Sequence, residues 1–233
     1  MMRVKEIKDA LLQLVFPHIC SGCGNDLLNN ESSLCLHCIS SLPETNFAMH
    51  ANNPAEKIFW GRLPIAAASA QYYFTKESLI QHLMHQFKYR GNQDLGMQLG
   101  RLMGQALSQT SRFNYLDGLV PLPLFSAKER KRGFNQAAVL CEGISEILKI
   151  PVLKNVIIRT QHTETQTQKG RIERWENIEG KFQLINNKLI NNKHILLIDD
   201  VITTGATLEA CGHELVKGEN VTLSIATLCI TAH

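Results

Sequence analysis

From residue 58 onward, the apolar positions of this chain follow two spacings in turn. Apolar residues three to four apart, the spacing of one helix face, recur over residues 79–87, 95–107, 136–148 and 206–216. Short apolar runs typical of strands lie at 63–74, 118–122, 152–158, 182–185, 194–198 and 221–228. Strands that alternate with helices predict an α/β domain over residues 58–233, with a mostly parallel sheet and helices on both faces.

The first part of the chain has a different pattern. Residues 1–16 place charged residues among apolar residues at helical spacing, which predicts a short amphipathic helix rather than a secretory signal. Residues 17–42 are rich in Cys, Ser, Asn and Gly, and residues 43–57 contain the Asn and Pro residues of a linker or loose loop. We therefore expect a small module over residues 1–45, ahead of the α/β domain.

The segment from Ile195 to Thr207 carries the most informative chemistry. Four apolar residues stop at two acids, Asp199 and Asp200, and the chain then turns into a helix. The residues of this turn, which we call the TTGAT loop, are Thr203, Thr204, Gly205, Ala206 and Thr207. Backbone N–H groups at a helix N-terminus bind phosphate, and glycine lets the chain approach closely. A strand that ends in solvated acids before a threonine cap is the simpler alternative.

A basic cluster follows the predicted strand at 118–122. Lys128, Arg130, Lys131 and Arg132 place four cations within five positions. A diphosphate needs such charges, and Lys128 and Arg132 are our candidates to contact it. A solvated basic loop is the alternative. Over the whole chain, 24 basic residues against 21 acidic residues give a net charge of +3, which suits an anionic ligand but does not argue for nucleic acid.

Four of the seven cysteines form two pairs with CxxC spacing. Cys20 and Cys23 make the first pair, and Cys35 and Cys38 make the second. Two such turns complete a tetrahedral zinc site, and four thiolates make the site structural rather than catalytic. Disulfides or free thiols are the alternative, but paired cysteines favour metal in the cytoplasm, which is where we expect the protein. No stretch resembles a membrane span.

These motifs together resemble a known family. The segment at 195–207 resembles the phosphoribosyl pyrophosphate (PRPP) loop of type I phosphoribosyltransferases. The sequences VPLPL at 120–124, RGFNQ at 132–136 and FKYRG at 87–91, with the cysteines, resemble the ComF family of competence-related proteins. A later series also matches that family: Thr163, Gln166, Arg174, Asn177 and Gly180. Lys169 and Lys181 depart from it, since the family usually has Leu and Ala there.

The resemblance implies two alternative functions. In the first, the protein is a Mg²⁺-dependent phosphoribosyltransferase, a pentosyltransferase that passes the phosphoribosyl group of PRPP to a nitrogen acceptor. Asp199 and Asp200 hold the ribose hydroxyls as the catalytic pair, and the TTGAT loop holds the 5′-phosphate. In the second, a non-catalytic module senses a nucleotide or phosphosugar during DNA uptake. Lys88, Arg90 and residues 128–132 then contact single-stranded DNA, or the module binds a DNA-processing protein.

Overall fold

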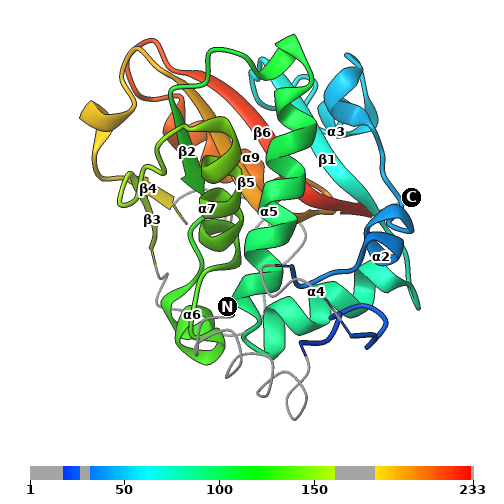
Figure 1. The fold of residues 1–233 in the computed structure, drawn as a ribbon. Helices are drawn as coiled ribbons and strands as arrows, with labels where there is room; N and C mark the ends of the chain where they lie inside the picture. The colour runs from blue at the N-terminus through cyan, green and yellow to red at the C-terminus, as the bar shows by residue number, and fades with distance from the viewer. Residues whose placement is uncertain (1–17, 27–31, 161–181, 232–233) are drawn as a thin grey trace, which may run out of the picture.

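The computed structural model describes residues 18–26, 32–160 and 182–231 (Figure 1). The amphipathic helix predicted over residues 1–16 lies outside these ranges. The later part of the family motif lies outside them as well, together with Lys169 and Lys181.

A four-stranded parallel sheet forms the centre of the molecule. Its strands are β1 (Ala67–Phe74), β2 (Gly118–Pro121), β5 (His194–Ile202) and β6 (Thr222–Thr231), in the order β1-β6-β5-β2. The strand predicted over 152–158 is mostly absent. Val152 makes a single bridge to Leu119, and β3 (Ile157–Arg159) pairs with β4 (Phe182–Leu184) in a separate antiparallel ribbon.

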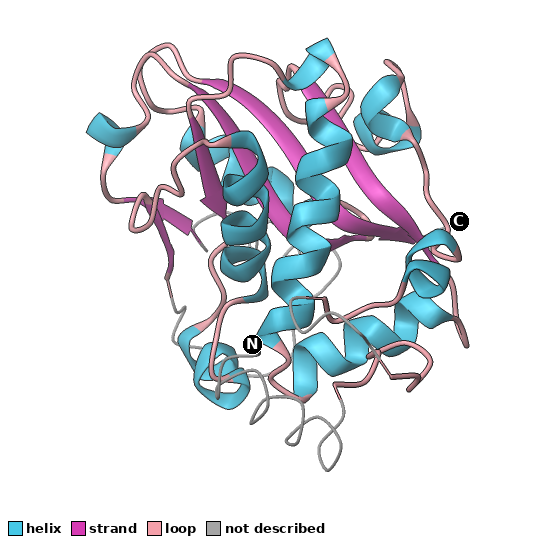
Figure 2. Ribbon diagram, viewed as in Figure 1, coloured by secondary structure: helices cyan, strands magenta, loops and turns pink. Residues whose placement is uncertain are grey.

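Helices cover both faces of this sheet, as predicted (Figures 1 and 2). One face carries α4 (Leu79–Tyr89), α5 (Gln93–Ser108) and α7 (Gln136–Leu148), and the other carries α9 (Ala206–Leu215). Successive side chains of a strand point to opposite faces. Leu196 and Ile198 therefore pack in the cluster with α5 and α7, whereas Ile195 and Leu197 pack in the cluster with α9.

Helices α5 and α7 approach each other closely through glycines. A Cβ atom on Gly100 would lie 2.5 Å from the carbonyl oxygen of Leu140, and one on Gly143 would lie 2.3 Å from that of Met97. Such distances are shorter than van der Waals contact, so the two helices pack backbone to backbone. This close packing fixes α7 against α5 on one face of the sheet.

The linker predicted over 43–57 is instead an ordered part of the core. It contains the short helices η1 (Phe47–Met49) and α3 (Pro54–Lys57). Asn53 is 4% exposed, and its Nδ2 donates to the carbonyl oxygens of Phe47 and Ala68 at 3.1 and 2.8 Å. Its Oδ1 accepts from the backbone N–H of Ala55 at 2.9 Å. Asn and Pro here form a helix cap and first turn, which resemble loop signals in the sequence.

The remaining described elements are short. They are α2 (Leu36–Ser40), η2 (Ser111–Phe113), α6 (Ser126–Arg132) and η3 (Asn187–Leu189). Among the described residues, no helix combines the length and the apolar composition that crossing a membrane requires.

Candidate functional site

Strand β5 does not end before the two acids, as its apolar run suggested, but continues through them to Ile202. Parallel pairing with β6 extends past Asp199, which lies opposite Thr227, and past Val201, which lies opposite Cys229. The two acids therefore occupy consecutive strand positions at the carboxyl edge of the sheet, where successive side chains face opposite sides.

Asp200 faces the side of the sheet that carries α4. Its Oδ2 lies 2.8 Å from Nζ of Lys88, and the side chains are 15% and 19% exposed, respectively. Lys88 belongs to the FKYRG sequence, so the fold brings that motif into the site. The charge of Lys88, which the DNA-uptake alternative predicts to contact DNA, is paired with Asp200 and largely buried in this structure.

Asp199 faces the side of the sheet that carries α9. Burial and the neighbouring Asp200 carboxylate raise the pKa of Asp199 to about 8, although Lys88 and Arg159 act in the opposite direction. The backbone N–H of Asp200 donates to Asp199 Oδ1 at 2.8 Å. Asp199 can thus keep its proton near neutral pH, until a ligand or cation changes the balance.

The TTGAT loop has the geometry of an anion-binding helix start. Gly205 has a φ of +75°, a conformation that glycine adopts without strain, and α9 begins at Ala206. Thr203 and Thr204 are exposed. The helix spans ten residues, so its first N–H groups carry the positive end of an aligned dipole.

Arg62 fixes this loop from the side. Its Nη1 donates to the carbonyl oxygen of Thr204 at 3.0 Å and to that of Ile58 at 3.0 Å. Its Nη2 also forms an ion pair with Glu209 of α9. The carbonyl oxygens of Ile58 and Thr204 therefore point toward Arg62.

The basic cluster forms the helix α6 rather than a loop. Arg130 and Lys131 are exposed, whereas Arg132 donates from Nη1 to Gln136 Oε1 at 2.7 Å. The guanidinium of Arg132 also lies 5.7 Å from the centre of the Tyr89 ring. The side chain of Lys128 lies outside the described part of the structure. Helix α6 and the end of α4 therefore meet at the same edge as the acids.

One residue of this edge was missed by the sequence analysis. Arg159, the last residue of β3, stacks on Phe125 with 3.7 Å between the guanidinium carbon and the ring centre. Burial lowers the pKa of Arg159, and the charge of Asp199 opposes that shift. A lone arginine at the end of a short strand carries no motif, so only the fold reveals it.

The four cysteines predicted to bind metal come together. Their Sγ atoms all lie within 4.8 Å of one another, and those of Cys23 and Cys35 are 3.7 Å apart. Tetrahedral zinc with bonds of about 2.3 Å separates its sulfurs by about 3.8 Å, so the donor set fits this ion. Backbone N–H groups of Gly22 and Cys35 donate to Cys20 Sγ at 3.4 and 3.2 Å. The four cysteines could therefore hold a zinc ion.

These thiols differ in how readily they lose a proton. Burial raises the pKa of the Cys20 thiol, but N–H donors from Cys23, Cys35 and Gly22 outweigh it and bring the pKa to about 6. Burial and hydrogen bonds from the other three cysteines raise the pKa of Cys38. A thiolate at Cys20 gives a metal ion its first anionic ligand at neutral pH.

The cysteine module is docked on α4 and α5. Gln98 Oε1 accepts from the backbone N–H groups of Ser33 and Leu34 at 2.6 and 2.9 Å, and Gln86 Nε2 donates to the carbonyl oxygen of Ser21 at 2.6 Å. Leu34, Cys20 and Cys38 belong to the same buried cluster as those helices. A hollow of about 450 Å³ remains between the module and α4, away from the acid pair.

This chain matches a known protein family and several known proteins. A family model described as phosphoribosyl transferase domain matches residues 135–233, which include both acids and the TTGAT loop. Competence protein F of Haemophilus influenzae is 30% identical over 204 residues, covering 85% of this chain and 84% of its own. The chain belongs to the ComF-like family.

Two further matches also cover most of this ComF-like chain. The DNA utilization protein YhgH of Salmonella typhimurium is 29% identical over 221 residues, covering 91% of this chain and 90% of its own. Among solved structures, adenine phosphoribosyltransferase from Leishmania tarentolae is 11% identical with a TM-score of 0.39, covering 82% of this chain and 94% of that protein. The ComF-like chain thus has a phosphoribosyltransferase-like α/β fold with a cysteine cluster at its N-terminal side.

Proposed function

We propose that this ComF-like protein binds PRPP with Mg²⁺ and transfers the phosphoribosyl group to a nitrogen acceptor. The observation that carries the proposal is the continuity of β5, the TTGAT loop and α9. Two acids near the carboxyl end of β5 are followed, after Ile202, by a short turn and a left-handed glycine that opens a ten-residue helix. A ligand that carries both a sugar diol and a phosphate matches this arrangement, because the acids can bind the diol and the helix start can bind the phosphate.

Each part of the site has a separate task in this proposal. The 5′-phosphate is bound by backbone N–H groups of the TTGAT loop and by the hydroxyls of its threonines. The loop consists of Thr203, Thr204, Gly205, Ala206 and Thr207. Asp199 and Asp200, near the carboxyl end of β5, accept hydrogen bonds from the ribose hydroxyls. Lys128 and Arg132 of α6 offset the charge of the pyrophosphate.

Magnesium suits this donor set, because it prefers carboxylate and phosphate oxygens and keeps several waters. When bound with PRPP, it neutralises the diphosphate that leaves. Asp199 and Asp200 orient the ribose so that its anomeric carbon faces the incoming nitrogen while the bond to pyrophosphate breaks. The negative charge of the acid pair also stabilises positive charge that develops on the sugar ring.

The cysteine module serves the site indirectly in this proposal. Zinc at Cys20, Cys23, Cys35 and Cys38 holds a module over residues 1–45, joined to the domain at 58–233. Its contacts with Gln86 of α4 and Gln98 of α5 stabilise these helices, and α4 carries the Lys88 that pairs with Asp200. Four cysteines that form no disulfide and lie close enough to share one zinc ion fit a protein of the reducing cytoplasm.

A pyrophosphate-release assay tests the transfer step. Zinc-loaded full-length protein is incubated with PRPP, Mg²⁺ and purine, pyrimidine or amine acceptors in turn. Release that depends on one acceptor and falls at least about 10-fold in Asp200→Asn supports the transferase. Binding of PRPP without release for any acceptor contradicts transfer and leaves the sensing module.

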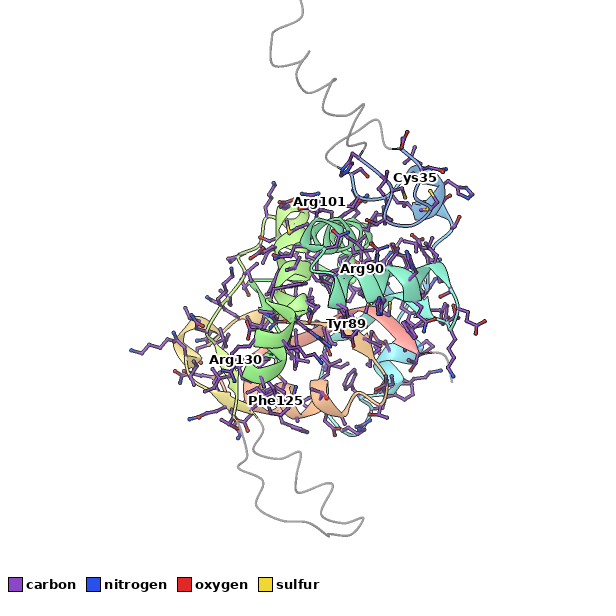
Figure 3. The ribbon with its side chains drawn as sticks, turned by 90° about the horizontal axis from the view of Figure 1, so that it is seen from below. Cys35, Tyr89, Arg90, Arg101, Phe125 and Arg130 are labelled. Atoms are coloured by element: carbon purple, nitrogen blue, oxygen red, sulfur yellow. The ribbon has the colours of Figure 1, made fainter. Side chains whose placement is uncertain are left out.

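A second candidate function has its own supporting observation. Tyr89 is 61% exposed beside Arg132, and Arg90, Arg130 and Lys131 are also exposed. In the view from below, Tyr89, Arg90 and Arg130 are seen together on one face (Figure 3). An aromatic ring among cations is the arrangement that stacks bases of single-stranded nucleic acid. Relatives named for competence and DNA utilization make a role in DNA uptake, with single-stranded DNA or a DNA-processing protein as partner, the alternative.

Salt-dependent binding of a labelled single-stranded oligonucleotide tests this surface. Affinity is expected to fall steeply with salt, and the double substitution Arg130→Ala with Lys131→Ala is expected to reduce the slope by about one per lost phosphate contact. Tyr89→Leu is expected to weaken binding at every salt concentration. Binding that none of these changes affects contradicts the assignment of this face.

A further inference from the structure

The guanidinium of Arg159 lies against two aromatic rings, and its Nε has no hydrogen-bond partner among the described residues. Its Cζ atom lies 3.7 Å from the centre of the Phe125 ring and 5.2 Å from that of Phe182. Phe182 is the residue directly opposite Arg159 in the β3–β4 pair. Aromatic rings stacked on a guanidinium fix its plane and leave the N–H groups at its edge available.

The buried donor of this group has no acceptor in the described part of the chain. Within residues 18–26, 32–160 and 182–231, Arg159 Nε is buried and makes no hydrogen bond. Buried donors are almost always satisfied in folded proteins, so an unsatisfied one in a candidate site indicates a group that the ligand supplies. The acceptor is expected to be anionic, because it must also offset the charge of a half-buried guanidinium.

The neighbours of Arg159 identify which part of the ligand lies there. Phe125 immediately precedes α6, the helix that carries Lys128 and Arg132, and the negative charge of Asp199 acts on Arg159 from the other direction. The guanidinium therefore lies against the segment after β2 and within the electrostatic influence of Asp199. A diphosphate attached to the ribose occupies that region.

We propose that Arg159 binds the pyrophosphate group of the ligand through the edge of its guanidinium, held flat by Phe125 and Phe182. This inference rests on the proposed binding of PRPP. Two N–H groups of one guanidinium match two phosphate oxygens, which lysine cannot reproduce. Arg159 thus keeps the leaving group in place beside the acids.

Calorimetric titration of the zinc-loaded full chain tests the proposal. The ligands are pyrophosphate with Mg²⁺ and, separately, ribose 5-phosphate. Arg159→Met is expected to weaken pyrophosphate binding about 10- to 100-fold and to leave ribose 5-phosphate binding within about 3-fold of the parent. Arg159→Lys is expected to lose affinity for pyrophosphate to a smaller extent. Arg101→Met, which removes an arginine paired with Glu146 between α5 and α7, is the matched control and is expected to change neither affinity.

Each remaining outcome overturns the inference in a recognisable way. If Arg159→Met and Arg159→Lys bind pyrophosphate as tightly as the parent, Arg159 has no such role while PRPP binding stands. If both variants lose ribose 5-phosphate and pyrophosphate equally, Arg159 only maintains the fold of the site. If the parent binds neither pyrophosphate nor PRPP, the proposed function itself fails, and the inference fails with it.

Discussion

Lys88 of α4 and Asp200 of β5 form an ion pair of 2.8 Å across the candidate site. This contact joins the FKYRG sequence to the strand that precedes the TTGAT loop, although the two segments are far apart in the chain. The ring of Phe87, the residue before Lys88, packs against that of Phe134 with 5.7 Å between the ring centres. Helix α4 is therefore part of the site, and the cysteine module that is docked on α4 can influence it.

Removing the lysine of this pair is expected to destabilise the protein. Lys88→Met leaves the Asp200 carboxylate largely buried without its partner, and should lower the free energy of unfolding by about 2 kcal/mol. Urea unfolding measures the change. Lys154→Met, which breaks an exposed pair with Glu142, is the control and should cost less than about 1 kcal/mol. A loss for Lys88→Met no larger than that of the control would contradict the structural importance of the pair.

The raised pKa of Asp199 predicts how stability changes with pH. The folded protein keeps the proton of Asp199 up to a pKa of about 8, whereas the unfolded chain loses it near a pKa of about 4. Between these values the folded state binds more protons, so this residue makes the free energy of unfolding fall as pH rises. Asp199→Asn removes that loss. Urea unfolding should therefore show a gain in stability for Asp199→Asn that grows from about pH 5 to about pH 8. An equal difference at both pH values would contradict the shift.

The cysteine cluster predicts about one zinc ion per chain. Cys38→Ser should lose the metal and lower the melting temperature of the whole described core, because Cys38 packs in the same cluster as α4 and α5. Cys229→Ala removes a fully buried thiol from β6 and should be destabilised while it keeps its zinc. Metal analysis with thermal melting distinguishes the two variants. Metal-free protein with four unpaired thiols would contradict the zinc assignment.

The sequence predicted the regular elements well where one periodicity dominated. Helix α7 has the predicted bounds, because its apolar residues repeat at helical spacing and Asn135 caps its start. Strand β5 was predicted to end too early, since aspartates are poor strand formers. Pairing with β6 on one side overrides that preference, and the two acids consequently face opposite sides of the sheet.

The remaining differences concern contacts between distant segments. No local pattern shows that Lys88 reaches Asp200, or that Phe125 and Phe182 enclose Arg159. Nor does any local pattern show that Asn53 bonds to Ala68 and becomes buried. These contacts depend on how strands and helices pack, which single-sequence patterns leave open.

Isothermal titration of PRPP with Mg²⁺ into the zinc-loaded chain tests the central claim most directly. The parent should bind PRPP, and Asp199→Asn and Asp200→Asn should each weaken this binding about 10- to 100-fold, because each loses a carboxyl acceptor for the ribose hydroxyls. Inorganic phosphate, which needs only the TTGAT loop, should bind both variants within about 3-fold of the parent. Absence of PRPP binding by the folded parent, or equal PRPP affinity in the parent and both variants, would contradict the account.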